Sequence, residues 1–317
     1  MEFLQGKREI MYHFIVNTKS RTGKAKKLWE EIKRELDDHS VKYDYQVTEY
    51  AGHAVEIARK LVRKYEAPVK IVVIGGDGTF NEVINGIKNH EKVQLGYIPT
   101  GSGNDLARGL GLSQEPMENL KRILKSKECW EMDLGCISWD DGESKRYFGV
   151  STGVGVDADV CRRVLYSSLK KILNKIGLGK LTYAILTIQS LFASPFLNAR
   201  IIADGKDYGK RSRCVFIAIM NHKCEGGGVP MSPTADAMDG KLSMCCVSGL
   251  GKIGALCAFP FLLKGKHMKL KACLGVDFKE ADIMLETPFV WHTDGEMCTF
   301  NTVMHVECIP GALKIMK

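Results

Sequence analysis

The sequence lacks an apolar run long enough to cross a membrane. Spanning a bilayer takes about 20 apolar residues, and the longest candidate, 253–263, is interrupted by Gly254 and Pro260. The first eleven residues include four charged side chains and lack the apolar core of a secretory signal. We therefore expect a cytoplasmic protein without a transmembrane anchor.

Motifs that pair cysteines or bind zinc are also missing. Eleven cysteines are scattered over 317 residues without a Cys-x-x-Cys pair, and the eight histidines form no His-Glu-x-x-His arrangement. Scattered cysteines in a chain without a secretion signal are typical of reduced thiols in the cytosol. The spacing therefore predicts neither a disulfide framework nor a zinc site.

Positive charge is in excess, with 45 Lys and Arg against 37 Asp and Glu, a formal net charge of +8. Two basic stretches alternate with apolar residues, which favours transient contact with an anionic membrane, although a solvated helix face would give the same pattern. No nucleic-acid-binding motif accompanies the charge, so we expect no nucleic acid partner. The stretches contain Arg162, Arg163, Lys170, Lys171, Lys175 and Lys180, then Lys264, Lys266, His267, Lys269 and Lys271.

The order of predicted elements indicates two domains. Up to Asp133, strand patterns alternate with amphipathic helix patterns, as in a parallel sheet covered by helices on both faces. After Asp133, short strand patterns dominate, among them Tyr147–Val154 and Val303–Cys308, and predict an antiparallel β-sandwich. We expect an α/β domain over 11–133 and a β-sandwich domain over 134–308, with a helical insertion near 156–193.

The most distinctive motif is a glycine-rich turn, Gly75–Thr79, with the sequence GGDGT. It follows the apolar run Val69–Ile74 and precedes an amphipathic helix. Glycines let backbone amides approach phosphate oxygens, and the helix adds its N-terminal dipole. Thr79 and Glu82 have the spacing of a capping box, which would specify the helix start. An ordinary strand-to-helix turn capped by Asp77 is the alternative interpretation.

A second turn of small residues, Pro99–Asp105, separates the apolar segment Val93–Ile98 from another helix pattern. Two such loops at one edge of a parallel sheet would face a common crevice, where open α/β sheets bind ligands. Together the two loops predict a phosphate site, whereas either one alone would more often be a simple turn.

The segments Gly75–Gly86 and Pro99–Arg108 resemble the signature blocks of the diacylglycerol kinase catalytic domain, a family that includes sphingosine, ceramide and bacterial soluble lipid kinases. The resemblance covers nearly the whole chain from residue 11. It implies a first domain similar to NAD kinases and phosphofructokinases, ATP and Mg²⁺ as cofactors, ATP between the domains, and a tail, 309–317, that packs back on the first domain. The nucleotide-binding residues that we expect are Asn17, Thr18, Ser20, Thr48, Gly75, Gly76, Asp77, Gly78, Thr79, Asn81, Glu82, Thr100, Gly101, Ser102, Asn104 and Asp105.

One of these loops departs from the family pattern. The family usually has Pro after the residue that corresponds to Asn17, and here Thr18 stands in that place. The sequence therefore leaves open how the loop Asn17–Lys24 contacts the nucleotide.

Phosphoryl transfer to an alcohol needs a carboxylate near the acceptor hydroxyl and positive groups near the transferred phosphate. Asp294 and Glu296 lie on one tight turn after the strand pattern Phe289–His292. In similar bacterial lipid kinases this block is assigned the catalytic base, with the Asp favoured in some members and the Glu in others, so both remain candidates. Asp77 is a third catalytic candidate, expected to help hold Mg²⁺. A plain hairpin turn is the alternative for the Asp294 block.

Two further blocks carry acidic residues. In the loop Asp236–Leu242, the resemblance implies a structural Mg²⁺ held by the Asp239 carboxylate and by backbone groups of Asp236 and Lys241; a metal-free hairpin is the alternative. The block Gly153–Ala158, with Asp157 as a minor site candidate, also resembles the family, and there we expect close backbone packing near the acceptor.

These features predict an ATP- and Mg²⁺-dependent kinase that phosphorylates a lipid hydroxyl in peripheral contact with the inner face of the membrane. We expect diacylglycerol as the acceptor, giving phosphatidic acid. Phosphatidylglycerol and a sphingoid base are alternatives, because one methylene changes binding in an apolar pocket by only ~1–3 kcal/mol. A soluble-substrate kinase similar to NAD kinases is a less favoured alternative. A homodimer is compatible with the sequence, which shows no interface.

Overall fold

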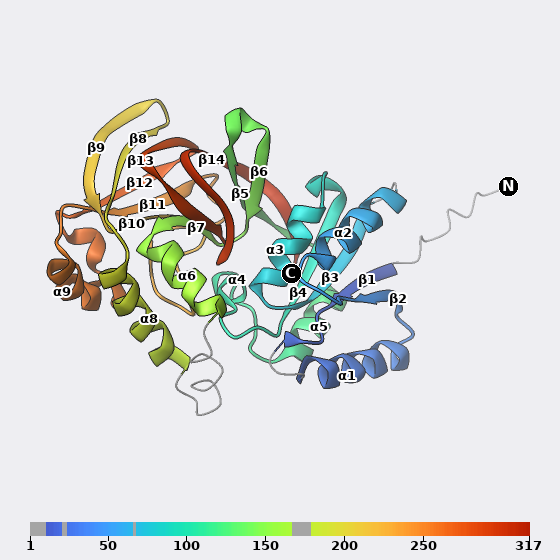
Figure 1. Ribbon diagram of the computed structural model, residues 1–317. Coiled ribbons are helices and arrows are strands. Elements are labelled where there is room, and N and C mark those ends of the chain that lie inside the picture. The colour runs from blue at the N-terminus through green and yellow to red at the C-terminus, as the bar shows by residue number, and fades with distance from the viewer. Residues whose placement is uncertain (1–10, 21–23, 66–67, 167–178) are drawn as a thin grey trace. The chain divides into compact units, whose positions relative to one another are not determined.

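The computed structural model describes residues 11–20, 24–65, 68–166 and 179–317 (Figure 1). The chain divides into two compact units. The first extends to Ser102 and includes Ser113–Trp130 and Leu313–Lys317, and the second consists of Gly103–Leu112 and Glu131–Ala312. No described helix is both long and apolar enough to cross a membrane. Lys170, Lys171 and Lys175 of the first basic stretch lie outside the described residues.

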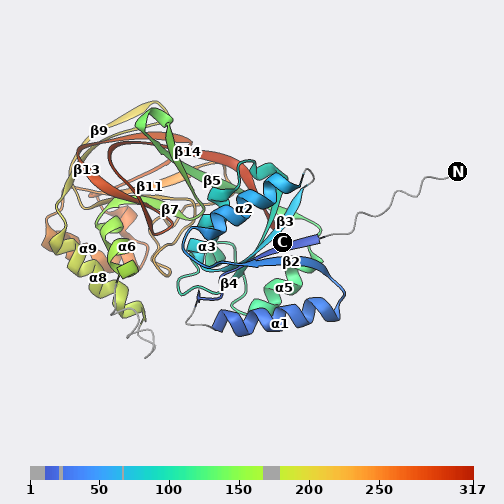
Figure 2. The same cartoon turned by 45° about the vertical axis from the view of Figure 1, so that its right-hand side comes forward.

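The first unit is a parallel sheet with helices on both faces, which confirms the predicted α/β class. Its elements are β1 (Met11–Val16), α1 (Lys24–Asp38), β2 (Lys42–Val47), α2 (His53–Lys64), β3 (Val69–Gly75), α3 (Asp77–Gly86), η2 (His90–Lys92), β4 (Val93–Pro99) and α5 (Pro116–Lys125). The strand order is β2-β1-β3-β4, and Lys314 and Ile315 pair in parallel with β4. Figures 1 and 2 show α1 and α5 on one face of this sheet and α2 and α3 on the other.

The core of this unit follows from the spacing of its apolar residues. Trp29, Ile32 and Leu36 recur every three or four residues and so share one face of α1. They pack with Phe14 of β1 and Ile74 of β3 in a single cluster, and each of the five side chains is at most 2% exposed. Full burial of such a side chain contributes about 1.5–3 kcal/mol. This packing fixes the strands whose carboxyl ends carry the predicted nucleotide loops.

The second unit is an antiparallel β-sandwich, as predicted. Its strands are β5 (Cys129–Trp139), β6 (Ser144–Phe148), β7 (Ser151–Gly155), β8 (Leu197–Ala203), β9 (Lys206–Cys214), β10 (Phe216–Met220), β11 (Leu242–Val247), β12 (Cys273–Phe278), β13 (Glu280–Thr293) and β14 (Glu296–Met316). The main order is β12-β11-β10-β7-β13-β14. Beside this path, β8 pairs with β13 and β9, and β5 pairs with β14 and β6.

Helices of the second unit come from three parts of the chain. They are α4 (Asp105–Gly109), α6 (Val156–Tyr166), α8 (Gly179–Ala193) and α9 (Lys252–Leu263), with the short 3₁₀ helices η3 (Asp140–Gly142) and η4 (His267–Lys269). The predicted helical insertion corresponds to α6 and α8, and residues 167–178 between them lie outside the described residues.

Two strand predictions were wrong in their bounds. The expected strand Tyr147–Val154 is divided into β6 and β7, because the backbone amides of Gly149 and Val150 donate to the carboxylate of Asp294. The expected strand Val303–Cys308 is only the middle of β14, which continues past Pro310. Local sequence patterns gave no signal for the division between β6 and β7, because Asp294 is distant from both strands in the sequence.

Candidate active site

The glycine turn lies where β3 ends and α3 begins. The first backbone hydrogen bond of α3 runs from the amide of Phe80 to the carbonyl of Gly76, at 3.1 Å. Within the described residues, no side chain caps the N-terminus of this helix. The first N–H groups of a helix have no partner within the helix. The amides of Asp77, Gly78 and Thr79 are therefore suited to bind an anion.

The predicted capping box does not form. Because α3 begins at Asp77, Thr79 lies inside the first turn and cannot act as its N-cap. The carboxylate of Glu82 instead accepts the amide of Ala54 at 3.1 Å, near the beginning of α2. Asn81 is fully buried, and its Oδ1 accepts from Asn85. The Glu82 carboxylate thus links α3 to α2, whereas the hydrogen bond between Asn81 and Asn85 lies within α3.

The two glycine-containing loops touch each other through their backbones. The amide of Thr100 donates to the carbonyl of Gly75 at 2.7 Å. A Cβ atom on Gly76 would lie 3.2 Å from the Cα of Gly101, closer than ordinary van der Waals contact. The approach of these backbones explains why glycine occupies the position of Gly76.

Short polar side chains connect three strand ends in the first unit. Asn17, after β1, donates from Nδ2 to Oγ1 of Thr79 at 3.0 Å. Ser20 and Thr100 share a hydrogen bond between their hydroxyls at 2.6 Å. The amide of Thr48, after β2, donates to the carbonyl of Val16 at 2.9 Å. The structure thus brings the predicted loop residues of four strands to one edge of the sheet.

The remaining predicted nucleotide residues have different surroundings. Asp77 Oδ1 accepts from the hydroxyl of Tyr97 at 3.3 Å. Thr18 and Gly78 are half-buried, and Ser102 is exposed. These positions agree with a polar, partly open edge.

Asn104 and Asp105 belong to the second unit. Asp105 accepts the amide of Gly227 at 2.8 Å and pairs with Arg108. Burial raises the pKa of Asp105, although Gly227 and Arg108 act in the opposite direction. Asn104 has a left-handed backbone, with φ of 51°, at the N-cap of α4. The contacts of Asp105 with Gly227 and Arg108 therefore lie within the second unit.

The acidic turn between β13 and β14 is held by backbone amides from another segment. Asp294 and Gly295 both have positive φ, 49° and 84°, as a tight hairpin turn requires. The carboxylate of Asp294 accepts the amide of Gly149 at 2.8 Å, that of Val150 at 2.8 Å and that of Ser151 at 3.0 Å. Asp294 thus fixes the segment between β6 and β7 against the turn.

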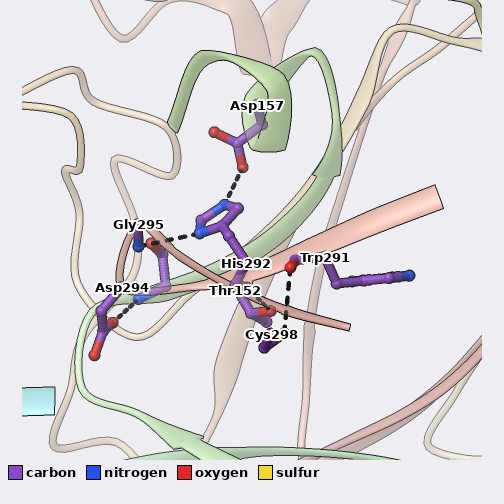
Figure 3. A network of polar contacts seen from close by, with 8 residues as sticks. Thr152, Asp157, Trp291, His292, Asp294, Gly295 and Cys298 are labelled. Atoms are coloured by element: carbon purple, nitrogen blue, oxygen red, sulfur yellow. Dashed lines mark hydrogen bonds and ion pairs between the residues drawn. The ribbon is translucent and has the colours of Figure 1, made fainter. Parts of the chain in front are cut away.

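A buried histidine supports the same turn (Figure 3). His292 is fully buried, and its Nε2 lies 2.8 Å from a carboxylate oxygen of Asp157 in α6. Its Nδ1 accepts the amide of Gly295 at 3.2 Å. When Nδ1 accepts, Nε2 carries the proton and donates to Asp157. Sequence reasoning missed His292, and its only signal was its place two residues before Asp294.

Family models match almost all of the chain. Residues 11–137 match the diacylglycerol kinase catalytic domain, and residues 150–317 match the YegS C-terminal NAD kinase beta sandwich-like domain. The chain belongs to the family of the YegS C-terminal NAD kinase beta sandwich-like domain, whose model covers more than half of it, and it also carries a diacylglycerol kinase catalytic domain. It is therefore an ATP-dependent kinase of the lipid kinase class.

Individual proteins similar to this lipid kinase come from several bacteria. The YtlR protein of Bacillus subtilis, provisionally named a lipid kinase, is 26% identical over 96% of this chain and 98% of its own length. A protein of Staphylococcus aureus named diacylglycerol kinase is 27% identical over 84% of this chain and 82% of its own. A crystal structure from Bacillus anthracis has a TM-score of 0.76 at 24% identity and covers 98% of each chain, which supports the fold.

A second buried acid of the kinase lies next to Asp157. Glu225 is 8% exposed, and burial, reinforced by the charge of Asp157, raises its pKa well above the usual range. Burial of a carboxyl group and a nearby negative charge both favour its protonated form. Burial also raises the pKa of the Cys161 thiol in the same surroundings. No motif in the sequence indicated Glu225 or Cys161.

The predicted metal loop of the kinase contains two local turns. Asp236 accepts the amide of Met238 at 3.1 Å, and Asp239 accepts the amide of Lys241 at 2.9 Å. Beside this loop, burial and the charges of Asp239 and Asp236 raise the pKa of Asp133. Carboxylate and carbonyl oxygens are the donors that Mg²⁺ takes. The donor set is suitable for the ion, and the assignment stays a prediction.

Proposed function

We propose that this kinase transfers the γ-phosphoryl group of ATP, in the presence of Mg²⁺, to the hydroxyl of diacylglycerol and so produces phosphatidic acid. One observation carries the proposal: the uncapped N-terminus of α3 lies in a glycine turn whose backbone touches the loop after β4. The Staphylococcus aureus relative is named for the same reaction, which supports diacylglycerol over the other lipids.

The first unit would hold the phosphates of ATP. Amides of Asp77, Gly78 and Thr79 supply donors at the positive end of the α3 dipole. The hydroxyls of Ser20 and Thr100 add neutral polar groups at the same edge. Mg²⁺, when bound, neutralises charge on the transferred phosphate, and Asp77 is the acid of this turn that could hold it.

The second unit would supply the acid–base chemistry. Asp294 already accepts three amides, and this favours a role in holding the turn. Glu296 lies on the same turn, at the start of β14. We therefore assign Glu296 the removal of the proton from the lipid hydroxyl, and Asp294 the positioning of Glu296. Both assignments rest on the family chemistry described above.

Membrane contact is assigned to α9. Although this helix is strongly apolar, none of its twelve residues, all of them described, is buried. Ile253 is 73% exposed, and Phe261 and Leu263 are about half exposed. An exposed apolar helix beside lysines is typical of a surface that enters the lipid interface. The lysines that follow it on the surface are Lys264, Lys266, Lys269 and Lys271.

One residue of the second basic stretch does not lie on the surface. His267 is buried, at 2% exposed, and cannot face a membrane. In the first stretch, Arg162 and Arg163 both form ion pairs with Asp159, so their charge is partly neutralised within the helix. The apolar face of α9 with its neighbouring lysines carries the membrane proposal instead.

Transfer of labelled γ-phosphate tests the reaction. The kinase is incubated with ATP and Mg²⁺ and with diacylglycerol, phosphatidylglycerol or a sphingoid base in anionic mixed micelles, with NAD as a soluble control. Label in phosphatidic acid supports the proposal. Label in another lipid would show that this lipid, and not diacylglycerol, is the acceptor. Label in NAD alone would overturn the assignment to lipids.

Membrane binding is tested separately by substitution in α9. Phe261→Ser combined with Leu263→Ser should reduce co-sedimentation with anionic vesicles and leave turnover on short-chain, micellar diacylglycerol unchanged. Leu165→Ser is the matched control, because Leu165 is 45% exposed and lies on α6. Equal vesicle binding by wild type and the α9 variant would contradict the assignment of α9.

A further inference from the structure

Two cysteines and a histidine converge in the second unit. Cys245 of β11, His267 of η4 and Cys273 of β12 each present a ligand atom, and these three atoms lie within 4.8 Å of one another. The two sulfur atoms are 3.5 Å apart. In the β11–β12 pair Cys245 is opposite Gly275 and Val247 is opposite Cys273, so both thiols lie on the same face of the sheet.

His267 has one nitrogen bonded and one without a partner. Its Nε2 lies 2.9 Å from the carbonyl of Met231 and donates its proton there. Its Nδ1 has no hydrogen-bond partner in the described part of the chain, although the residue is only 2% exposed. Buried polar atoms are almost always paired. Metal-binding histidines characteristically donate their second N–H to a carbonyl in this way, which leaves the other nitrogen for the ion.

A third sulfur lies beside the thiols. The thioether of Met268 is 3.5 Å from the sulfur of Cys273. Its terminal methyl occupies the space that a side chain at position 275 would fill, since a Cβ on Gly275 would lie 2.4 Å from it. The absence of a side chain at Gly275 thus allows Met268 to reach this position. The surroundings are rich in soft donors, which select Zn²⁺ or Cu(I) over Mg²⁺.

We propose that Cys245, His267 and Cys273 bind one Zn²⁺ ion. Two thiolates on tetrahedral Zn²⁺, each at about 2.3 Å, are about 3.8 Å apart, close to the sulfur separation observed here. A disulfide would need about 2.05 Å. Two thiolates also neutralise Zn²⁺, whereas Cu(I) would leave a net negative charge in a largely buried site. Binding releases both thiol protons to solvent, and water or Met268 completes the coordination.

The role of this ion would be structural. It would tie η4 to the β11–β12 pair, and η4 follows the apolar helix α9 after only three residues. The site would therefore fix the base of α9 independently of the kinase reaction. The spacing along the chain gives no zinc motif, because the ligands come from two strands and a short helix.

Metal content and cobalt spectra test the site directly. The full chain is purified under reducing conditions, its metal is measured, and the ion is then removed with a chelator and replaced by Co²⁺. We expect about one Zn²⁺ per chain as purified and thiolate-to-cobalt charge-transfer absorption after replacement. Cys273→Ala and His267→Gln should each weaken Co²⁺ binding at least about tenfold.

Cys214→Ala is the matched control. Cys214 and Cys246 form another close thiol pair, at 3.9 Å, but no metal-ligand group of three forms around them in the described part of the chain. This variant should retain the cobalt spectrum. Absence of the charge-transfer absorption in wild type would overturn the proposal, as would equal binding by wild type and Cys273→Ala. A disulfide between Cys245 and Cys273 in metal-free purified protein, found by mass spectrometry, would also overturn it.

Discussion

The nucleotide edge of the first unit and the acidic turn of the second are built in opposite ways. The nucleotide edge relies on backbone amides, glycines and short hydroxyl side chains, most of them within Gly75–Thr79 and Pro99–Ser102. The acidic turn relies on ionisable side chains from distant segments: Asp157 contacts His292 over a separation of 135 residues. Binding an anion needs donors that every backbone carries. Proton transfer needs side chains whose surroundings have been tuned by burial and charge.

The two regions should therefore respond differently to substitution. In the first unit, single changes should weaken ATP binding and raise its KM. In the second, single changes should lower turnover, because the carboxylates there are assigned to the proton of the acceptor.

Glu296→Gln should have the largest effect. The amide has nearly the same shape but cannot accept the proton of the lipid hydroxyl, so we expect kcat to fall by about 10²–10⁴-fold. The melting temperature and the KM for ATP should stay near those of wild type. Steady-state kinetics with a lipid acceptor and thermal unfolding measure both. Retention of wild-type turnover would move the role of base to Asp294.

Asp294→Ala should lower both turnover and stability. The amides of Gly149, Val150 and Ser151 would lose a charged acceptor, and hydrogen bonds to charged groups contribute about 1.5–3 kcal/mol each. Because water can replace part of this loss, we expect at least about 2 kcal/mol of destabilisation in urea unfolding. Asp294→Asn retains one acceptor oxygen, so its stability should lie between those of wild type and Asp294→Ala. An unchanged unfolding midpoint in Asp294→Ala would show that this carboxylate does not hold the segment.

His292→Gln tests positioning of the turn. The substitution removes the link between Asp157 and the amide of Gly295, and small displacements of catalytic groups can cost up to about 10²-fold in rate. We expect kcat to fall about 10–100-fold with little change in the KM for ATP. Asp157→Asn, which keeps a hydrogen-bond acceptor for His292, should lose less. If His292→Gln instead raised KM alone, the histidine would act on binding and not on the turn.

The fold could be predicted well from the sequence because its signals are local. The apolar spacing of Trp29, Ile32 and Leu36 specifies one helix face, and the apolar segments Val69–Ile74 and Val93–Ile98 form the strands β3 and β4. The predicted strand bounds were wrong where a residue or strand distant in the sequence determines where a strand begins or ends. The division between β6 and β7 depends on Asp294, and β14 continues past Pro310 because its last residues pair with β4.

The candidate site divides in the same way. Loop residues such as Thr79 and Thr100 could be proposed from the sequence because glycine and hydroxyl motifs are contiguous. His292 and Glu225 were not found, because a single histidine or glutamate gives no signal until the fold buries it beside Asp157. The capping box failed for a related reason: Glu82 has a better partner, the amide of Ala54 at the start of another helix.

Glu225→Gln should change how stability depends on pH. The pKa of Glu225 is raised by burial and by Asp157 above its ordinary value of 4.5. The folded state therefore holds a proton that the unfolded state releases, and stability falls as pH rises from about 4.5 toward the pKa in the folded state. The slope is at most about 1.4 kcal/mol per pH unit. Urea unfolding from about pH 5 to pH 8 should show a flatter profile for the variant, and parallel profiles would contradict the buried proton.

Thr79→Val should have the smallest effect, and it probes the first unit alone. Valine keeps the shape that packs against Gly75, but it removes the acceptor for Nδ2 of Asn17, whose hydrogen bond is 3.0 Å long. Loss of one such bond costs about 1 kcal/mol, which corresponds to about a fivefold rise in the KM for ATP. Thr79→Ser keeps the hydroxyl and should restore the wild-type KM. Since the substitution leaves Glu296 and the acidic turn unchanged, kcat should not fall; a lower kcat at normal KM would mean that the nucleotide edge takes part in the chemical step, and the contrast between the two regions would no longer hold.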